Sequence, residues 1–175
     1  MGGAIAGVYA TAHPEHVGAL ALLDTAGLAA PHASALEREL AGGANPFLYT
    51  DRASFAALLK LAFATPPRLP GRFQDVYIER NRRDLDFLRS TFARLQDDAD
   101  RQILTPRLDR LTMPVLGLWC RNDQLVDVST LDTLRNGLGT ASTISTSIIN
   151  DCGHLPMLER PAATARVLTG FVLSH

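Results

Sequence analysis

Two short runs of almost wholly apolar residues constrain the fold of this chain more than any other feature. The runs are Val17 to Leu23 and Val115 to Trp119, and a third β-like run extends from Ile144 to Ile149. Strands that are apolar at nearly every position are buried on both faces, which is typical of parallel sheets covered by helices. With helical segments between these runs, the sequence predicts an α/β fold of about three parallel strands, flanking helices and right-handed crossovers.

The segments expected to flank this sheet have the marks of helices. Gly2 to His13 carries small residues on one face, which suits close packing against another element. Ser129 to Leu138 ends among glycines, and Pro161 to Leu173 begins with proline at a first-turn position.

The stretch from residue 28 to residue 110 has a different character, with helical patterns, breaks and no β-like run. Ser34 and Glu37 have the spacing of a capping box, Asp51 to Phe63 has apolar residues at helical spacing, and Thr65 to Gly71 is a proline-rich break. We therefore expect residues 1–27 and 111–175 to form an α/β core that is interrupted by a helical insertion at residues 28–110.

Composition excludes several classes of protein. The 175 residues suffice for one domain with a core, and a net charge of −1 without a Lys/Arg cluster gives no electrostatic basis for binding nucleic acid. The two cysteines, Cys120 and Cys152, are too few for a disulfide framework and are expected to be small packing residues. No Cys/His spacing resembles a zinc site, so neither a metal nor a cofactor is expected.

The N-terminal segment, Met1 to Ala12, is apolar and ends in a sequence that resembles a signal-peptide cleavage site. It lacks the positively charged region that precedes the apolar part of a signal peptide, which argues against that interpretation. No apolar run in the sequence is long enough to span a bilayer. We expect a cytoplasmic location and leave association with a membrane surface open.

Two residues that can carry acid–base chemistry follow predicted strands. His154 lies on a short turn after Gly153, behind the third run, and Asp123 lies just after the second run. Loops at the carboxyl ends of parallel strands meet at one edge of the sheet and often hold catalytic groups. Because an aspartate that orients a histidine forms a general base, this pair is the candidate catalytic centre. The other four histidines lack such a setting.

Two other aspartates compete with Asp123 for this role. Asp24 ends the first strand and could reach His154 from there, while Asp127 suits the cap of the helix that follows it. Asp123 is preferred because it lies closer than Asp127 to the end of its strand, and Asp24 and Asp127 remain the alternative acids.

No residue in the chain is a convincing nucleophile. None of the serines lies on a Gly-x-Ser-x-Gly turn, and most fall in predicted helices or in the third strand. Cys152 lies too close to His154 along one turn to attack a substrate held between them. The third member of a catalytic triad is therefore missing from the sequence.

Several blocks of the sequence, taken together, resemble the α/β-hydrolase family. In order, they resemble the helix after the nucleophile elbow, the link to the next strand, the acid loop, and the histidine loop with its final helix. The subgroup that matches best is the monoacylglycerol lipase/esterase type of bacterial and animal hydrolases, and the match is weakest in the insertion, which would be the cap. The blocks are Met1 to Ala10, His13 to Val17, Asn122 to Ser129, Asp151 to His154 and Leu158 to Pro161.

The resemblance implies a serine hydrolase that acts on small or lipid-like carboxylic esters, such as acylglycerols. His154 would be the general base, Asp123 would orient it, and the backbone N–H of Met1 would belong to the oxyanion hole. The serine would precede Met1, together with the earlier strands, so the chain would be the C-terminal part of the fold and inactive on esters by itself.

The sequence departs from the family pattern in two further places. Cys120 replaces the glycine that usually follows the strand, so the turn to Asp123 would be reshaped, or strained if the φ angle of Cys120 were positive. The connection between Asp123 and His154 is also a few residues longer than usual, around Thr140 to Ser147.

Other functions are compatible with the same loops. Carbon–carbon bond hydrolases, dehalogenases and haloperoxidases share the histidine and aspartate loops, and a dehalogenase would need an aspartate at the missing elbow. A function without catalysis is a short protein that acts as a binding module or pairs with a separate N-terminal half. The DNA upstream of the Met1 codon would distinguish these alternatives.

Overall fold

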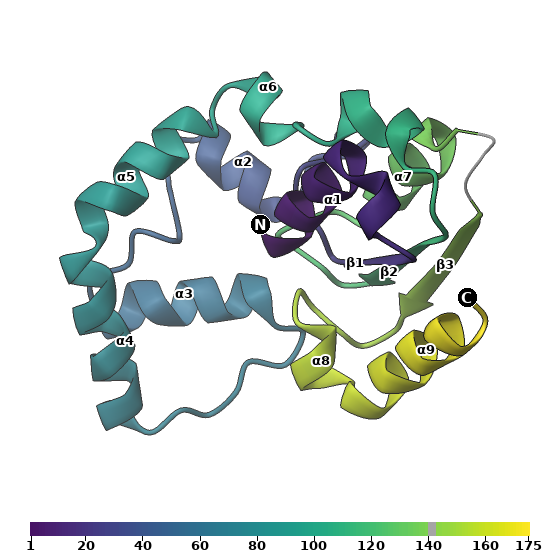
Figure 1. Cartoon of the computed structure of the whole chain (residues 1–175). Coiled ribbons are helices and arrows are strands. Elements are labelled where there is room, and N and C mark those ends of the chain that lie inside the picture. Colours follow the sequence, from purple (N-terminus) through teal and green to yellow (C-terminus); the bar gives the residue numbers. More distant parts are fainter. Residues whose placement is uncertain (140–142) are drawn as a thin grey trace.

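The chain folds, in a computed structural model, around a parallel sheet with the strand order β1-β2-β3 (Figure 1). The structure describes residues 1–139 and 143–175. Leu20 lies opposite Val115, and Val115 lies opposite Ile144, so β2 is the central strand. The predicted fold class is confirmed. The strands are β1 (Leu20–Leu23), β2 (Val115–Cys120) and β3 (Ile144–Ile149).

The first strand is shorter than the apolar run predicts. Pro14–His16 forms a 3₁₀ turn, η1, and Val17 closes that turn with its backbone N–H donated to the carbonyl of Pro14. The strand can therefore begin only at Leu20. The third strand has the predicted bounds, although Thr140 to Ser142, part of the connection expected to be longer, lie outside the described residues.

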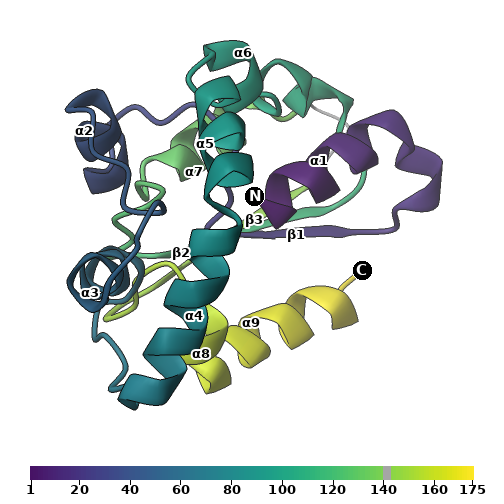
Figure 2. The same cartoon turned by 90° about the vertical axis from the view of Figure 1, so that its left-hand side faces the viewer.

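Helices cover both faces of the sheet, as Figure 2 shows with α1 (Gly2–Ala12) on one side and α9 (Pro161–Leu173) on the other. Alternate residues of β2 face opposite sides, because side chains alternate along a strand. Val115 and Trp119 pack in a cluster that includes residues of α1, η2 (Thr105–Arg110) and α7 (Thr130–Gly137). Leu116 and Leu118 pack on the opposite face, where α9 contributes Phe171.

Helix α1 packs closely on the loop after β1 and on the residue ahead of η2. A Cβ atom on Gly3 would lie 2.1 Å from Oγ1 of Thr25, and one on Gly7 would lie 2.6 Å from Cδ2 of Leu104. No larger residue fits at either position without displacing its neighbour. This contact places the start of α1, and therefore Met1, beside the loop that follows β1.

The helical insertion (residues 28–110) contains no strand, and every residue of it is among those that the structure describes. Ser34 and Glu37 form the predicted capping box at the start of α2, and Asp51 caps α3. Figure 1 shows these helices beyond one end of the sheet. The helices between β1 and η2 are α2 (Ala35–Ala41), α3 (Arg52–Ala62), α4 (Gly71–Arg83), α5 (Leu85–Arg94) and α6 (Asp98–Arg101).

One short helix was not predicted. Pro156–Glu159 forms α8, a single turn between the His154 loop and α9. Within residues 1–139 and 143–175, no helix is both long enough and apolar enough to cross a lipid bilayer.

Candidate active site

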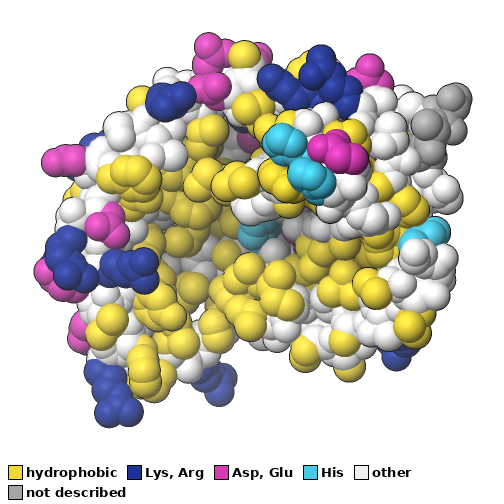
Figure 3. All heavy atoms as spheres, in the orientation of Figure 1, with side chains coloured by type: hydrophobic (Ala, Val, Ile, Leu, Met, Phe, Trp, Pro, Cys, Tyr) yellow, Lys and Arg dark blue, Asp and Glu magenta, His cyan; other side chains and the backbone are white. Residues whose placement is uncertain are grey.

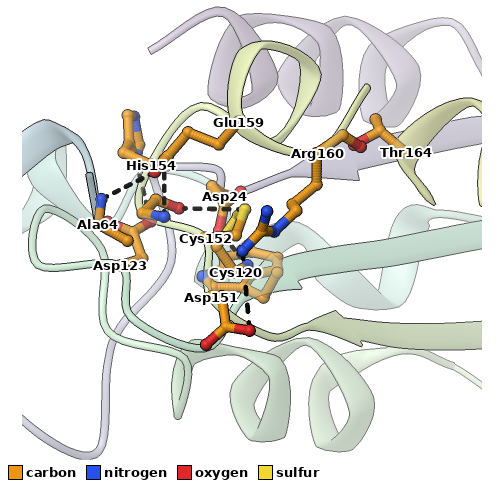
Figure 4. Close-up of a disulfide and its surroundings, with 12 residues drawn as sticks. Asp24, Ala64, Cys120, Asp123, Asp151, Cys152, His154, Glu159, Arg160 and Thr164 are labelled. Atoms are coloured by element: carbon orange, nitrogen blue, oxygen red, sulfur yellow. Dashed lines mark hydrogen bonds and ion pairs between the residues drawn. A yellow bond between two sulfur atoms is a disulfide. The ribbon is translucent and has the colours of Figure 1, made fainter. Parts of the chain in front are cut away.

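Three ionisable side chains come together where the strands end. Asp24 follows β1, Asp123 follows β2 and His154 follows β3. The strands are parallel, so their carboxyl ends lie at the same edge of the sheet. Figure 4 shows Asp24, Asp123 and His154 grouped there.

Asp123 and His154 form a hydrogen-bonded pair. Nδ1 of His154 lies 2.9 Å from Oδ2 of Asp123. The Asp123 side chain is fully buried, whereas 23% of the His154 side chain is exposed. The carboxylate can only accept at this distance, which assigns the ring proton to Nδ1 and leaves Nε2 as an acceptor.

The backbone holds the Asp123 carboxylate in this orientation. Its Oδ1 accepts hydrogen bonds from the backbone N–H groups of Leu125 at 2.8 Å and Val126 at 3.1 Å. A carboxylate with two N–H donors on one oxygen is stabilised as the anion and cannot rotate freely. The other oxygen is therefore presented to the imidazole.

The His154 loop lies directly against the end of α3. The backbone N–H of His154 donates to the carbonyl of Ala62 at 2.8 Å. A Cβ atom on Gly153 would lie 2.6 Å from the backbone nitrogen of Ala64 and 2.8 Å from the carbonyl oxygen of Ala62. Glycine is required at 153 because two backbone segments approach each other at that point.

Glu159 of α8 joins the His154 loop to the helical insertion, and sequence reasoning missed it. Its Oε1 accepts from the N–H of Gly153 at 2.7 Å, and its Oε2 accepts from the N–H of Ala64 at 2.9 Å and of Thr65 at 3.3 Å. One carboxylate therefore satisfies backbone donors on both sides of the junction (Figure 4). The sequence offers no local signal for this contact, because its partners lie far apart along the chain.

The two cysteines form a disulfide, which corrects the expectation that they are separate packing residues. Cys120 and Cys152 are both fully buried, and their Cα atoms lie 5.0 Å apart. The bond joins the end of β2 to the His154 loop, just ahead of Asp123 and His154. Only the register of β2 and β3 brings the two residues together, and cysteine spacing alone does not show it.

Cys120 does not have the positive φ angle that would strain its backbone. The non-glycine residues with positive φ in this part of the chain are Asp24, at 43°, and Asp151, at 52°. Cys120 is the last residue of β2, so the family's glycine is replaced here without a left-handed backbone.

Asp24 is buried beside the pair but has no contact with His154. Its Oδ1 accepts the backbone N–H of Cys120 at 2.8 Å, and its Oδ2 is buried without a hydrogen-bond partner. Burial, followed by the nearby negative charge of Asp123, raises the pKa of Asp24 to about 9. Asp127 caps the turn into α7 instead, through the backbone N–H of Ser129 at 2.9 Å.

Met1, the expected oxyanion donor, is the N-cap residue of α1. Its side chain is exposed, while burial lowers the pKa of its amino group. The contact of Gly3 with Thr25 places this end of α1 near the loop that carries Asp24. Among the residues that the structure describes, no hydrogen bond joins Met1 to His154, so the role of Met1 stays a prediction.

No nucleophile contacts the pair in the part of the chain that the structure describes. The only hydrogen bond of the His154 ring there goes to Asp123, so no hydroxyl or thiol group reaches Nε2. Ser34 and Ser54 belong to helix caps, and Ser129 accepts the N–H of His32.

One group of side chains could hold a metal ion away from the pair. One ligand atom each of His13, Glu15 and His16 lies within 4.8 Å of the others. All three side chains are exposed, and such groups are common without an ion, so we assign them no role.

Surface depressions of about 420 Å³ on α4 and about 320 Å³ between η2 and α7 are not lined by Asp123 or His154.

Comparison with known proteins shows the family to which this fold belongs. The sequence profile of the alpha/beta hydrolase family matches residues 1–167. The chain belongs to the α/β-hydrolase family.

The relatives of this chain include enzymes of the lipase and esterase type. Monoacylglycerol lipase abhd6-B of Xenopus laevis is 29% identical over 181 residues, which cover 99% of this chain and 53% of that protein. The crystal structure of a bacterial membrane phospholipase A has a TM-score of 0.87 and 34% identity, over 98% of this chain and 54% of that one. This chain therefore spans about half the length of the relatives it matches.

The fold is shared by a hydrolase that is named for a different substrate. The 2-hydroxy-6-oxo-6-phenylhexa-2,4-dienoate hydrolase of Rhodococcus sp. strain RHA1 has a TM-score of 0.74 at 24% identity, over 98% of this chain and 61% of that one. At this level of identity the likeness concerns the fold alone.

Proposed function

We propose that the chain provides the histidine and the acid of a Ser-His-Asp triad that hydrolyses carboxylic esters of the acylglycerol kind. The observation that carries the proposal is the 2.9 Å hydrogen bond between His154 Nδ1 and the buried Asp123 carboxylate. The serine is contributed by a segment outside these 175 residues, because none of the chain's serines has the required setting.

The arrangement suits proton transfer at Nε2 of His154. When the serine attacks the ester carbonyl, Nε2 accepts its proton, and Asp123 stabilises the imidazolium that forms. The proton then passes to the leaving alcohol, and an acyl-enzyme remains. Water activated by the same nitrogen releases the acid in the second half of the reaction.

The negative charge on the carbonyl oxygen needs donors that are already oriented. The backbone N–H of Met1 is our candidate for one of them, since Met1 is the N-cap residue of α1 at this edge of the sheet. A donor of this kind contributes on the order of 10²–10³ in rate.

The surroundings of the pair favour an apolar acyl group. Figure 3 shows a hollow between the helical insertion and the sheet, with hydrophobic side chains gathered around it. Large exposed apolar residues on α4, α5 and α8 include Val76, Phe87 and Leu158. We propose that the insertion acts as the cap over this hollow. Phe55 is buried, and its ring contacts those of Tyr49 and Tyr77 within the insertion.

The test begins with the DNA upstream of the Met1 codon. We expect an in-frame strand followed by Gly-x-Ser, and the longer protein should hydrolyse p-nitrophenyl and monoacylglycerol esters. In that protein, Asp123→Asn should lower kcat by roughly 10³–10⁴-fold, because the imidazole would take the wrong tautomer. Asp127→Asn is the matched control and should retain activity.

The 175-residue chain alone should not react with a fluorophosphonate probe for serine hydrolases. Robust labelling would show that one of its own serines is the nucleophile and would contradict the proposal. If the longer protein cleaved carbon–carbon bonds and no esters, it would be a carbon–carbon bond hydrolase rather than an esterase. A stop codon just upstream of Met1 would favour a binding protein.

A further inference from the structure

We propose that Asp24 is a neutral carboxylic acid that donates a hydrogen bond to the Asp123 carboxylate and acts as a positioning residue for the Asp123–His154 pair. The effect on catalysis rests on the proposed function, whereas the protonation of Asp24 does not. Asp24 would thus complete a line of three residues, one from each strand end.

One carboxyl oxygen of Asp24 is buried without a hydrogen-bond partner. Asp24 is 2% exposed, and its Oδ1 already accepts the N–H of Cys120. Its Oδ2 is buried and accepts no hydrogen bond. An ionised oxygen without a donor is costly in such a place, whereas a protonated one can donate. Asp123 lies beside it at this edge of the sheet (Figure 4), and the charge of Asp123 contributes to the raised pKa of Asp24.

The proton should reside on Asp24 because the two acids have unequal surroundings. Two carboxylates buried side by side do not both ionise. Asp123 has two backbone donors and the imidazole of His154 to stabilise its charge. Asp24 has one backbone donor, from Cys120.

The charged groups around Asp24 support the same assignment. Burial contributes most to the raised pKa of Asp24, followed by the charge of Asp123 and, more weakly, that of Glu159 from α8. The N–H of Cys120 opposes these effects. His154 is bonded to Asp123, and its ring can carry a positive charge.

A protonated Asp24 would serve the pair in two ways. It gives the Asp123 carboxylate a further fixed donor, which limits its rotation away from the imidazole. It also leaves only one negative charge on the two aspartates, and the positive charge of the imidazolium balances it.

The assignment predicts a particular dependence of stability on pH. Burial and Asp123 raise the pKa of Asp24 from 3.8 to about 9, so the folded chain holds a proton that the unfolded chain releases. The stability due to this proton is complete below the unfolded pKa, declines as the pH rises, and is lost above the folded pKa. Asp24→Asn cannot ionise, so its melting temperature relative to the parent should increase between about pH 5 and about pH 8.5.

Asp151→Asn is the matched control for this substitution. Asp151 also has a positive φ, and its side chain is 85% exposed. Asparagine tolerates the left-handed conformation at both positions, so backbone strain is equal in the two variants. The melting temperature of this control relative to the parent should not change with pH in the same way.

The decisive measurement is the ¹³Cγ chemical shift of Asp24 in the 175-residue chain, assigned by its absence in Asp24→Asn. We expect it to titrate near the raised pKa of about 9. Titration close to the ordinary value of about 4 would overturn the proposal, as would a pH-independent difference between Asp24→Asn and the parent.

Activity in the longer protein then tests positioning. Asp24→Asn, which keeps a donor, should retain kcat within about threefold, and Asp24→Ala should lose about tenfold or more with little change in KM. Equal losses in both variants would contradict the hydrogen-bond role. If the longer protein hydrolyses no ester while Asp24 still titrates near 9, the proposed function fails and the protonation of Asp24 stands.

Discussion

The carboxyl edge of the sheet and the helical insertion are built in different ways. At the edge, Leu22, Leu118 and Trp119 are fully buried, and the buried carboxylate of Asp123 has three hydrogen bonds. In the insertion, stability is more local, with helix caps at Ser34 and Asp51 and stacked aromatic rings. Large apolar side chains remain exposed there.

The difference indicates that the two regions respond to mutation differently. The edge depends on dense packing around the strands, which transmits any change in volume. The insertion meets the edge through polar contacts, including those of Glu159 and the hydrogen bond between His154 and Ala62, and through an apolar cluster in which Leu61 and Ala62 pack with Leu125. A substitution at an exposed position of the insertion should therefore change the stability of the whole chain less than one at the buried edge.

The largest expected contrast is between Trp119→Ala and Phe87→Ala. Trp119 is fully buried in β2, and its removal leaves a cavity that should lower the free energy of unfolding by about 3–5 kcal/mol. Phe87 lies on α5 with 71% of its surface exposed, and its removal should change stability by less than about 0.5 kcal/mol. Urea unfolding measures both. Similar losses would show that the insertion is as tightly packed as the edge.

The disulfide gives the next effect in size. Cys120 and Cys152 enclose a loop of sequence separation 32 at the edge, so opening it should cost about 2–4 kcal/mol of unfolding free energy. We expect a lower melting temperature after reduction, and no response to reductant in the Cys120→Ala/Cys152→Ala variant. A native protein with two reactive thiols in the absence of reductant would contradict the bond.

The sequence predicted the edge better than the insertion for a physical reason. A strand that is buried on both faces is a continuous apolar run in the sequence. The sequence therefore predicted β2 and β3 with nearly their observed bounds. Asp123 and His154 follow such runs directly. In the insertion, α2 and α3 begin at local caps that the sequence shows, but the arrangement of the helices depends on contacts between distant residues.

The features that the sequence did not show all depend on such contacts. The disulfide requires the register of β2 against β3, and the bonds of Glu159 require α8 to meet the end of α3. The protonation of Asp24 requires knowledge of its burial and of its neighbour Asp123. From its position in the sequence, Asp24 was a possible alternative to Asp123. The structure distinguishes the two, because Asp123 is bonded to His154 whereas Asp24 accepts from the N–H of Cys120.

Removing the contact of Glu159 between the His154 loop and the insertion should have a smaller effect on stability than the two changes above. It should have the clearest effect on how the insertion is held against the loop. Glu159→Ala removes the acceptor for the N–H groups of Gly153, Ala64 and Thr65, which should cost about 1–2 kcal/mol because water can replace part of these bonds.

Hydrogen exchange can locate that loss. The amides of Ala64 and Gly153 should exchange faster in Glu159→Ala, because both donate to the carboxylate that is removed. Glu37→Ala is the control, since it opens a capping box within the insertion and should affect α2 alone. If Glu159→Ala left both amides protected, the His154 loop and the insertion would be joined by packing rather than by this carboxylate, and the two regions would form one stability unit.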